Sequence, residues 1–147
     1  MEAIVLVGIQ GSGKSTFAHA RFGQTHVRIS RDVVKTPHRE RVLQYACLSL
    51  GQDFIADNTH TTPAARAPLI AAARAAGFRV VAYWFPVDVD AALARNAARS
   101  GRSRVPDVAI HATAAKLVPP ARAEGFDAIY AVRIDGADYL IEESADE

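Results

Sequence analysis

The sequence predicts a three-layer α/β fold, in which helices cover both faces of a parallel β-sheet. Three observations lead to this prediction. Short apolar runs rich in β-branched residues alternate along the chain with longer segments of helical spacing, as in a parallel sheet with crossover helices. The chain has 147 residues, the size of one compact domain. A glycine-rich turn follows the first apolar run directly and leads into a helical segment.

Local sequence signals place the first elements. We expect a buried strand at residues 4–7, a helix at 15–21 and a strand at 26–30, where apolar and polar residues alternate. A longer helix is expected at 39–50, because apolar residues recur at helical spacing as far as Gly51, which ends it.

The second half of the chain alternates in the same way. Pro63 stands where the first turn of a helix tolerates proline, and Gly77 ends the Ala-rich segment that follows. The expected strands are residues 54–56, 79–85 and 128–134, and the expected helices are residues 64–76, 88–99 and 106 to about 117.

Charge is unevenly distributed along the chain. Residues 1–134 hold all 17 Lys and Arg but only 10 of the 16 Asp and Glu, a net charge of +7. We therefore expect one domain over 1–134, followed by an acidic tail over 135–147. A basic domain suits a phosphate-rich partner, but a general compositional richness in Arg and Ala explains the same charge.

Composition argues against several protein classes. No apolar run approaches the roughly 18 residues of a membrane helix, and the apolar start lacks the basic leader of a signal peptide. The single cysteine, Cys47, cannot form an internal disulfide, and the five histidines show no metal-ligand spacing. We expect a cytoplasmic protein without a zinc site, and the oligomeric state stays open.

A phosphate-binding motif occupies the glycine-rich turn. Residues 8–15 read GIQGSGKS and match GxxxxGK[ST] between a strand and a helix, which predicts a P-loop. Its glycines let backbone N–H groups turn toward phosphate oxygens at a helix N-terminus. Lys14 would neutralise the β- and γ-phosphates and Ser15 would ligate Mg²⁺, so ATP and Mg²⁺ are the expected cofactors. The predicted cofactor-binding residues are Gly8, Gly11, Ser12, Gly13, Lys14, Ser15 and Thr16.

Two carboxylates follow expected strands. Asp32 follows the second strand, so it would face the crevice where such sheets bind ligands and act as general base for an alcohol acceptor. Asp57 ends the third strand and is, with Ser15, the predicted metal residue. Helix capping is the alternative role for Asp32, and an Asx turn with a helix cap before Pro63 is the alternative for Asp57.

An arginine cluster predicts a helical lid over about 95–117. Arg95 and Arg99 lie four residues apart on one face of an expected helix, and Arg102 and Arg104 follow in a loop. Arginines that close over a transferred phosphoryl group stabilise its charge, and closure expels water. Arg95 and Arg99 are therefore predicted catalytic residues beside Lys14 and Asp32, with a solvated helix face as the alternative.

Six short segments, in order and spacing, resemble the kinase domain of the polynucleotide 5′-hydroxyl kinase family, within the small P-loop kinases. They span nearly the whole chain and are GIQGSGKST at 8–16, SRD at 30–32, DNTH at 57–60, RNAAR at 95–99, VP at 105–106 and EGFD at 124–127. The resemblance implies that Lys14 and Ser15 bind phosphate and magnesium. It further implies Asp32 as the base for the 5′-hydroxyl, and Arg99 with Arg95 as lid arginines.

One position departs from the resemblance. The family has an arginine three residues after the base, where it engages an acceptor phosphate, and this chain has Lys35, which keeps the charge but lacks the bidentate fork. The predicted function is an ATP-dependent kinase for the 5′-OH of DNA or RNA, with Asp32 and Lys35 on the acceptor. The alternatives are a kinase for a nucleoside, sugar, antibiotic or aminoacyl-tRNA, and a nucleotide-binding module without transfer activity.

Overall fold

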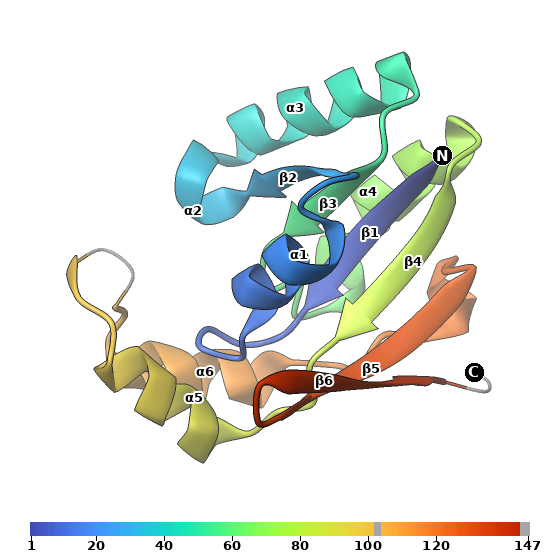
Figure 1. Cartoon of the computed structure of the whole chain (residues 1–147). Coiled ribbons are helices and arrows are strands. Elements are labelled where there is room, and N and C mark those ends of the chain that lie inside the picture. Colours follow the sequence, from blue (N-terminus) through green and yellow to red (C-terminus); the bar gives the residue numbers. More distant parts are fainter. Residues whose placement is uncertain (102–103, 145–147) are drawn as a thin grey trace.

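A computed structural model describes residues 1–101 and 104–144 of the chain. Six strands form one sheet in the order β2-β3-β1-β4-β5-β6. They are β1 (Glu2–Val7), β2 (Val27–Ser30), β3 (Phe54–Asp57), β4 (Arg79–Trp84), β5 (Ala128–Asp135) and β6 (Asp138–Glu143). The first five run parallel and β6 runs antiparallel to β5. The predicted α/β fold is confirmed (Figure 1).

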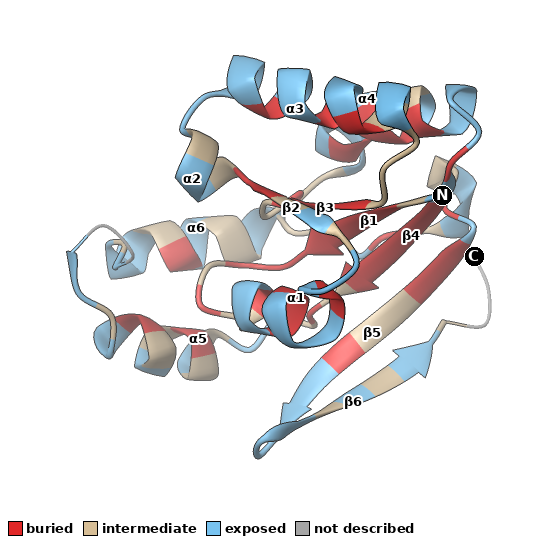
Figure 2. Ribbon diagram, turned by 45° about the horizontal axis from the view of Figure 1, so that its top comes forward, coloured by how far each residue is buried: buried red, intermediate tan, exposed pale blue. Residues whose placement is uncertain are grey.

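Helices cover both faces of this sheet. The α-helices are α1 (Lys14–Phe22), α2 (Arg31–Val34), α3 (Pro37–Leu50), α4 (Pro63–Ala75), α5 (Val89–Ala97) and α6 (Asp107–Lys116), and η2 (Arg122–Glu124) is a short 3₁₀ turn. Alternate residues of β1 face opposite layers, as strand geometry requires. Leu6 packs with Phe17 of α1, whereas Val5 belongs to the cluster that holds Ile70 of α4 and Cys47 of α3. Figure 2 shows the buried strands between helices whose outer faces are exposed.

A smaller apolar cluster joins the P-loop to the two lid helices. Ile9 of the P-loop packs with Ala92 of α5 and Ile110 of α6. Buried Asn96 closes the connection between these helices, because its amide accepts from the N–H of Val105 at 2.9 Å and donates to the Val105 carbonyl at 2.7 Å. The helices of the predicted lid are therefore packed against the phosphate-binding turn.

The expectation of an acidic tail is wrong for residues 138–143. These residues form β6, which pairs with β5 from Tyr130↔Glu143 to Asp135↔Asp138. Tyr139 and Ile141 alternate here with the exposed Asp138, Leu140 and Glu142, and their side chains pack against the cluster around Phe17. Gly136, with φ 61°, supplies the positive φ of the two-residue hairpin turn. Because one face of the segment is apolar and packs on the core, the segment joins the sheet as an edge strand.

The fold also bears on the single cysteine and on membrane insertion. Cys47 lies in the core, and burial raises the pKa of its thiol. Among residues 1–101 and 104–144, no helix has the length and apolar character needed to cross a membrane.

Candidate nucleotide and acceptor site

The P-loop turns tightly between β1 and α1. Gly11 and Gly13 have φ angles of 75° and 92°, in the left-handed region that glycine adopts without strain. A Cβ on Gly11 would lie 2.6 Å from the carbonyl oxygen of Ala92, so α5 also requires glycine there. Gly13 caps α1 without contributing a side chain, which leaves the first N–H groups of the helix to an anion.

Lys14 is buried inside this turn. Its Nζ donates to the carbonyl oxygens of Gly8 at 3.0 Å and Ile9 at 2.9 Å. Desolvation lowers the pKa of Lys14 to about 8, and the negative charges of Asp57 and Asp32 partly oppose this shift. The ammonium is thus held at the base of the P-loop, close to both predicted carboxylates.

A cleft of about 710 Å³ opens over the P-loop. It brings together the P-loop, α2, the end of β3 and the segment after α5. The predicted site residues that line it are Gly11, Ser12, Gly13, Lys14, Ser15, Asp32, Lys35, Asp57 and Arg99. Gly8 lies beneath the turn as a hydrogen-bond acceptor of Lys14, and Thr16 is exposed on α1 outside the cleft.

Two buried polar atoms of the P-loop are available to a ligand. The Oγ of Ser12 and the Oε1 of Gln10 are buried and have no hydrogen-bond partner among the residues that the structure describes. Buried polar groups are normally hydrogen-bonded, so such atoms in a phosphate-binding turn indicate a site completed from outside. The motif pattern leaves the residue at position 10 unspecified, so sequence reasoning missed Gln10.

The two predicted metal residues are in direct contact. Ser15 Oγ donates to Asp57 Oδ2 at 3.0 Å. A hydroxyl and a carboxylate are oxygen donors of the kind that Mg²⁺ takes, so this pair fits a magnesium ion that completes its shell with phosphate oxygens and water. The capping role for Asp57 is wrong, because Thr62 caps α4 and accepts from the N–H of Ala65 at 3.1 Å.

Sequence reasoning missed a third member of this pair. Arg28 of β2 donates from Nε to Asp57 Oδ2 at 2.8 Å and from one terminal nitrogen to Ser15 Oγ at 2.9 Å. The available signal was strand periodicity. Arg28 shares a face with Ser30, which pairs with Asp57 on the neighbouring strand.

Asp32 lies on α2 and is exposed to the cleft. The capping alternative is wrong for this residue as well. The next long helix, α3, is capped by Thr36, which accepts from the N–H of Arg39 at 3.2 Å, and α2 itself begins after Ser30. Asp32 therefore lines the cleft from the first turn of α2 and caps neither helix.

Lys35 has an unusual backbone. Its φ and ψ are 77° and −38°, and the N–H of Thr36 donates to the carbonyl of Val34 at 3.0 Å, which closes a strained three-residue γ-turn around Lys35. A side chain other than glycine in this region costs free energy, and such strain gathers at functional sites. The γ-turn places Lys35 in the lining of the cleft.

The two lid arginines occupy different places. Arg99 lines the main cleft. Arg95 instead donates to the carbonyl oxygen of Gly11 at 3.0 Å and lines a second hollow of about 250 Å³ beside Ser12. Arg104 is exposed, and Arg102 lies outside the described residues. The predicted pair is therefore divided between the cleft and the back of the P-loop.

A family comparison agrees with this architecture. The sequence profile of a family described as AAA domain matches residues 36–120, more than half of the chain. The chain belongs to this AAA domain family. The family and the P-loop together make it a P-loop kinase-like domain.

Solved structures share the fold of this AAA domain. A gluconokinase from Sinorhizobium meliloti 1021 is 19% identical with a TM-score of 0.62, over 89% of this chain and 81% of that chain. Kti12 of Chaetomium thermophilum, in complex with ADP-AlF3, is 17% identical with a TM-score of 0.64, over 90% and 89%. A chain of the PezAT toxin-antitoxin system of Streptococcus pneumoniae is 16% identical with a TM-score of 0.66, over 88% and 67%. At these identities the likeness shows the fold alone. It does not extend to the polynucleotide 5′-hydroxyl kinase family that the sequence resembles.

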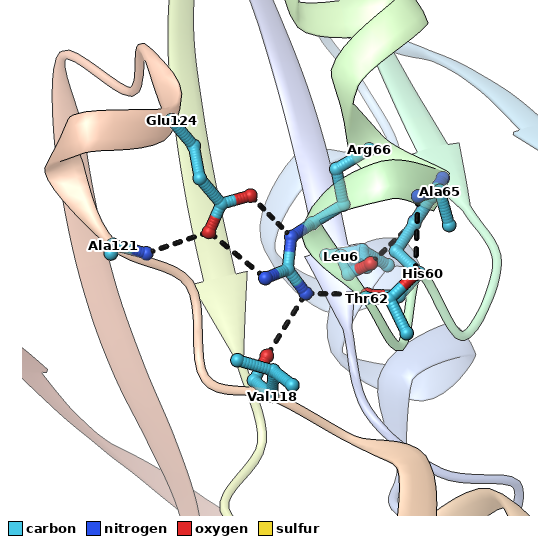
Figure 3. Close-up of polar contacts among 8 residues, drawn as sticks. All are labelled: Leu6, His60, Thr62, Ala65, Arg66, Val118, Ala121 and Glu124. Atoms are coloured by element: carbon cyan, nitrogen blue, oxygen red, sulfur yellow. Dashed lines mark hydrogen bonds and ion pairs between the residues drawn. The ribbon is translucent and has the colours of Figure 1, made fainter.

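A buried polar network in the AAA domain is centred on Arg66 (Figure 3). Arg66 of α4 is fully buried and pairs with both carboxylate oxygens of Glu124 at 2.8 and 2.9 Å. Its remaining terminal nitrogen donates to the carbonyls of His60 at 2.7 Å and Val118 at 3.0 Å. Glu124 belongs to the EGFD segment, so in this segment the glutamate of the family resemblance stabilises the fold and does not line the cleft.

His60 connects this network to β1. Its Nδ1 lies 2.7 Å from the carbonyl oxygen of Leu6, which requires the proton on Nδ1. Burial lowers the pKa of His60 to about 4, so the ring is neutral at physiological pH. The preceding residue, Thr59, lines the cleft and accepts the N–H of Gly8 at 3.1 Å. The network therefore fixes the β3 side of the cleft relative to the P-loop.

Proposed function

We propose that this domain is an ATP-dependent kinase that transfers the γ-phosphate to a hydroxyl group, with the 5′-OH of a polynucleotide as acceptor. One observation carries the proposal. The phosphate-binding Lys14, the Ser15–Asp57 pair and the carboxylate of Asp32 converge on a single cleft. A nucleotide-binding module without transfer activity has no need of a carboxylate on the acceptor side.

The donor nucleotide would lie along the P-loop. Its β- and γ-phosphates would accept from the N–H groups at the start of α1 and from Lys14. Ser15 and Asp57 would hold magnesium, which when bound neutralises phosphate charge. The second hollow shares Ser12 with the main cleft and is walled by Arg95 and Arg133, so the nucleoside would extend into it.

Asp32 would act on the acceptor. Its carboxylate accepts the proton of the hydroxyl as the hydroxyl oxygen bonds to the γ-phosphorus. The bond from the γ-phosphorus to the bridging oxygen breaks, and ADP leaves with that oxygen. Arg99, in the same cleft, would stabilise the charge on the transferring phosphoryl group.

The Asp32→Asn variant is expected to lose transfer by about 10²-fold or more, the contribution of a positioned base. It should fold and bind ADP like the wild type, because Asp32 caps no helix. The measurement is transfer from labelled ATP to a panel of 5′-OH DNA, 5′-OH RNA, nucleosides and sugars. Asp138→Asn, the same change on exposed β6, is the matched control. A wild-type rate in Asp32→Asn would remove the base from the mechanism.

The polynucleotide acceptor is supported by cations beside Asp32. Arg31 and Lys35 line the cleft, and Arg39 and Arg41 are exposed on the adjoining helix. Each phosphate neutralised by such a residue makes binding weaken with salt. An acceptor affinity that stays flat from low to high salt would favour a small-molecule kinase instead.

Lys35→Gly is expected to stabilise the fold while weakening acceptor binding. Glycine relieves the γ-turn strain, and after its own entropy cost the net gain is about 1 kcal/mol in the free energy of unfolding. Loss of the ammonium should reduce the slope of log affinity against log salt by about 0.7–0.9. Urea unfolding and acceptor binding at several salt concentrations measure the two effects.

Lys35→Ala is the control for that variant. It removes the same charge but keeps the strain, so it should match Lys35→Gly in acceptor binding and not in stability. Unchanged acceptor affinity in both variants would show that Lys35 does not contact the acceptor.

A further inference from the structure

A guanidinium group closes the predicted magnesium pair into a triangle. Arg28 reaches Asp57 Oδ2 at 2.8 Å and Ser15 Oγ at 2.9 Å, and the latter two atoms lie 3.0 Å apart. The Asp57 side chain is only 5% exposed, so few other groups reach it. Arg28 and a metal ion at this pair would therefore use the same two oxygen atoms.

The two modes of binding conflict chemically. A metal ligand offers a lone pair, and the hydrogen bond from Arg28 occupies one of the two lone pairs of Ser15 Oγ. Asp57 Oδ2 accepts from Arg28 and from Ser15 together. A dication brought to these oxygens would also meet the positive charge of the guanidinium within contact distance.

We propose that Arg28 is an internal competitor of magnesium, which holds Ser15 and Asp57 until the metal arrives with the nucleotide. The proposal rests on the proposed nucleotide binding. Arg28 lies on the edge strand β2 and its side chain is 24% exposed, so the guanidinium has a path away from the pair. This competition raises the Mg²⁺ concentration needed for binding, because the metal must replace two charge-assisted hydrogen bonds.

The competition makes Arg28 a determinant of metal requirement. Removing the guanidinium should lower the Mg²⁺ concentration for half-maximal ADP binding by about tenfold, the scale of one or two charge-assisted hydrogen bonds. Lysine at this position keeps the charge but loses the fork that joins both oxygens, so its effect should be intermediate.

The test is a Mg²⁺ titration of ADP binding by calorimetry, with the wild type, Arg28→Gln and Arg28→Lys. Arg21→Gln, an exposed arginine on α1, is the matched control and should keep the wild-type midpoint. Thermal unfolding of each variant without ligand checks that the fold is retained. A midpoint about tenfold lower in Arg28→Gln, with Arg28→Lys between, supports the proposal.

The other outcomes overturn it in distinct ways. An unchanged midpoint shows that Arg28 does not oppose the metal, and a higher midpoint shows that it assists. In EDTA, Arg28→Gln should bind ADP no more tightly than the wild type, and a gain there would mean that Arg28 opposes the nucleotide itself. ADP binding that is absent from the wild type at every Mg²⁺ concentration overturns the proposed function and the competition together.

Discussion

Lys14→Ala is expected to lower phosphoryl transfer by at least about 10³-fold, because in the proposed mechanism its ammonium neutralises the phosphates where negative charge develops. Its Nζ is already fixed by the carbonyls of Gly8 and Ile9, so little reorganisation is needed when a nucleotide arrives. Single-turnover transfer from labelled ATP at saturating acceptor measures the loss. Lys116→Ala, which removes an exposed lysine at the end of α6, is the control.

The pH dependence of nucleotide binding gives a second measurement on the same residue. The pKa of Lys14 is about 8 in the folded protein and 10.5 for an ordinary lysine. A bound phosphate favours the charged ammonium, so binding above about pH 8 should take up protons, and ADP affinity should fall as pH rises through that value. Calorimetry in two buffers of different ionisation heat measures the uptake. Lys14→Arg, which stays charged, should show none.

Arg66→Met is expected to lower the free energy of unfolding by about 3–5 kcal/mol, because it leaves the Glu124 carboxylate, whose side chain is only 12% exposed, without its charged partner. The carbonyls of His60 and Val118 also lose a donor. Urea unfolding measures the loss. Arg74→Met is the matched control on the same helix, since the Arg74 side chain is half exposed and its ion pair with Asp127 spans 3.5 Å. That change should cost about 1 kcal/mol or less.

A double variant distinguishes the ion pair from simple packing. Arg66→Met combined with Glu124→Leu removes both charges, so it should be less destabilising than the sum of the two single changes. An Arg66→Met variant that is no less stable than Arg74→Met would show that the buried pair contributes nothing beyond its volume.

The order of the elements was predictable because most of their ends have local causes. Gly51 ends α3 in the left-handed region with φ 69°, as its position after the apolar repeat predicted. The start of α3 lies two residues before the predicted start, since Thr36 caps the helix and Pro37 occupies its first turn. Thr36 and Pro37 are both visible in the sequence, but the predicted start was taken from the spacing of apolar residues alone.

Contacts between distant segments were harder to predict. Arg95 was assigned to the cleft from its spacing with Arg99, but its acceptor is the Gly11 carbonyl on the P-loop. That contact depends on how α5 packs on Ile9, which no local pattern specifies. Arg28 was missed for a similar reason, because its partners come from α1 and β3, and only the strand register brings them together.

The strand order separates charge across the sheet. β2, which carries Arg28 and leads to Arg31 and Lys35, lies at one edge, and β6 with its acidic residues lies at the other. At about 4.8 Å between neighbouring strands, these edges are roughly 24 Å apart, so their charged side chains contribute opposite ends of an electric dipole in the plane of the sheet. Near a polyanion, this dipole exerts a torque that turns the basic edge forward before contact. The polynucleotide proposed as acceptor would then meet the edge that carries Arg28 first, and added salt would slow association by weakening that torque.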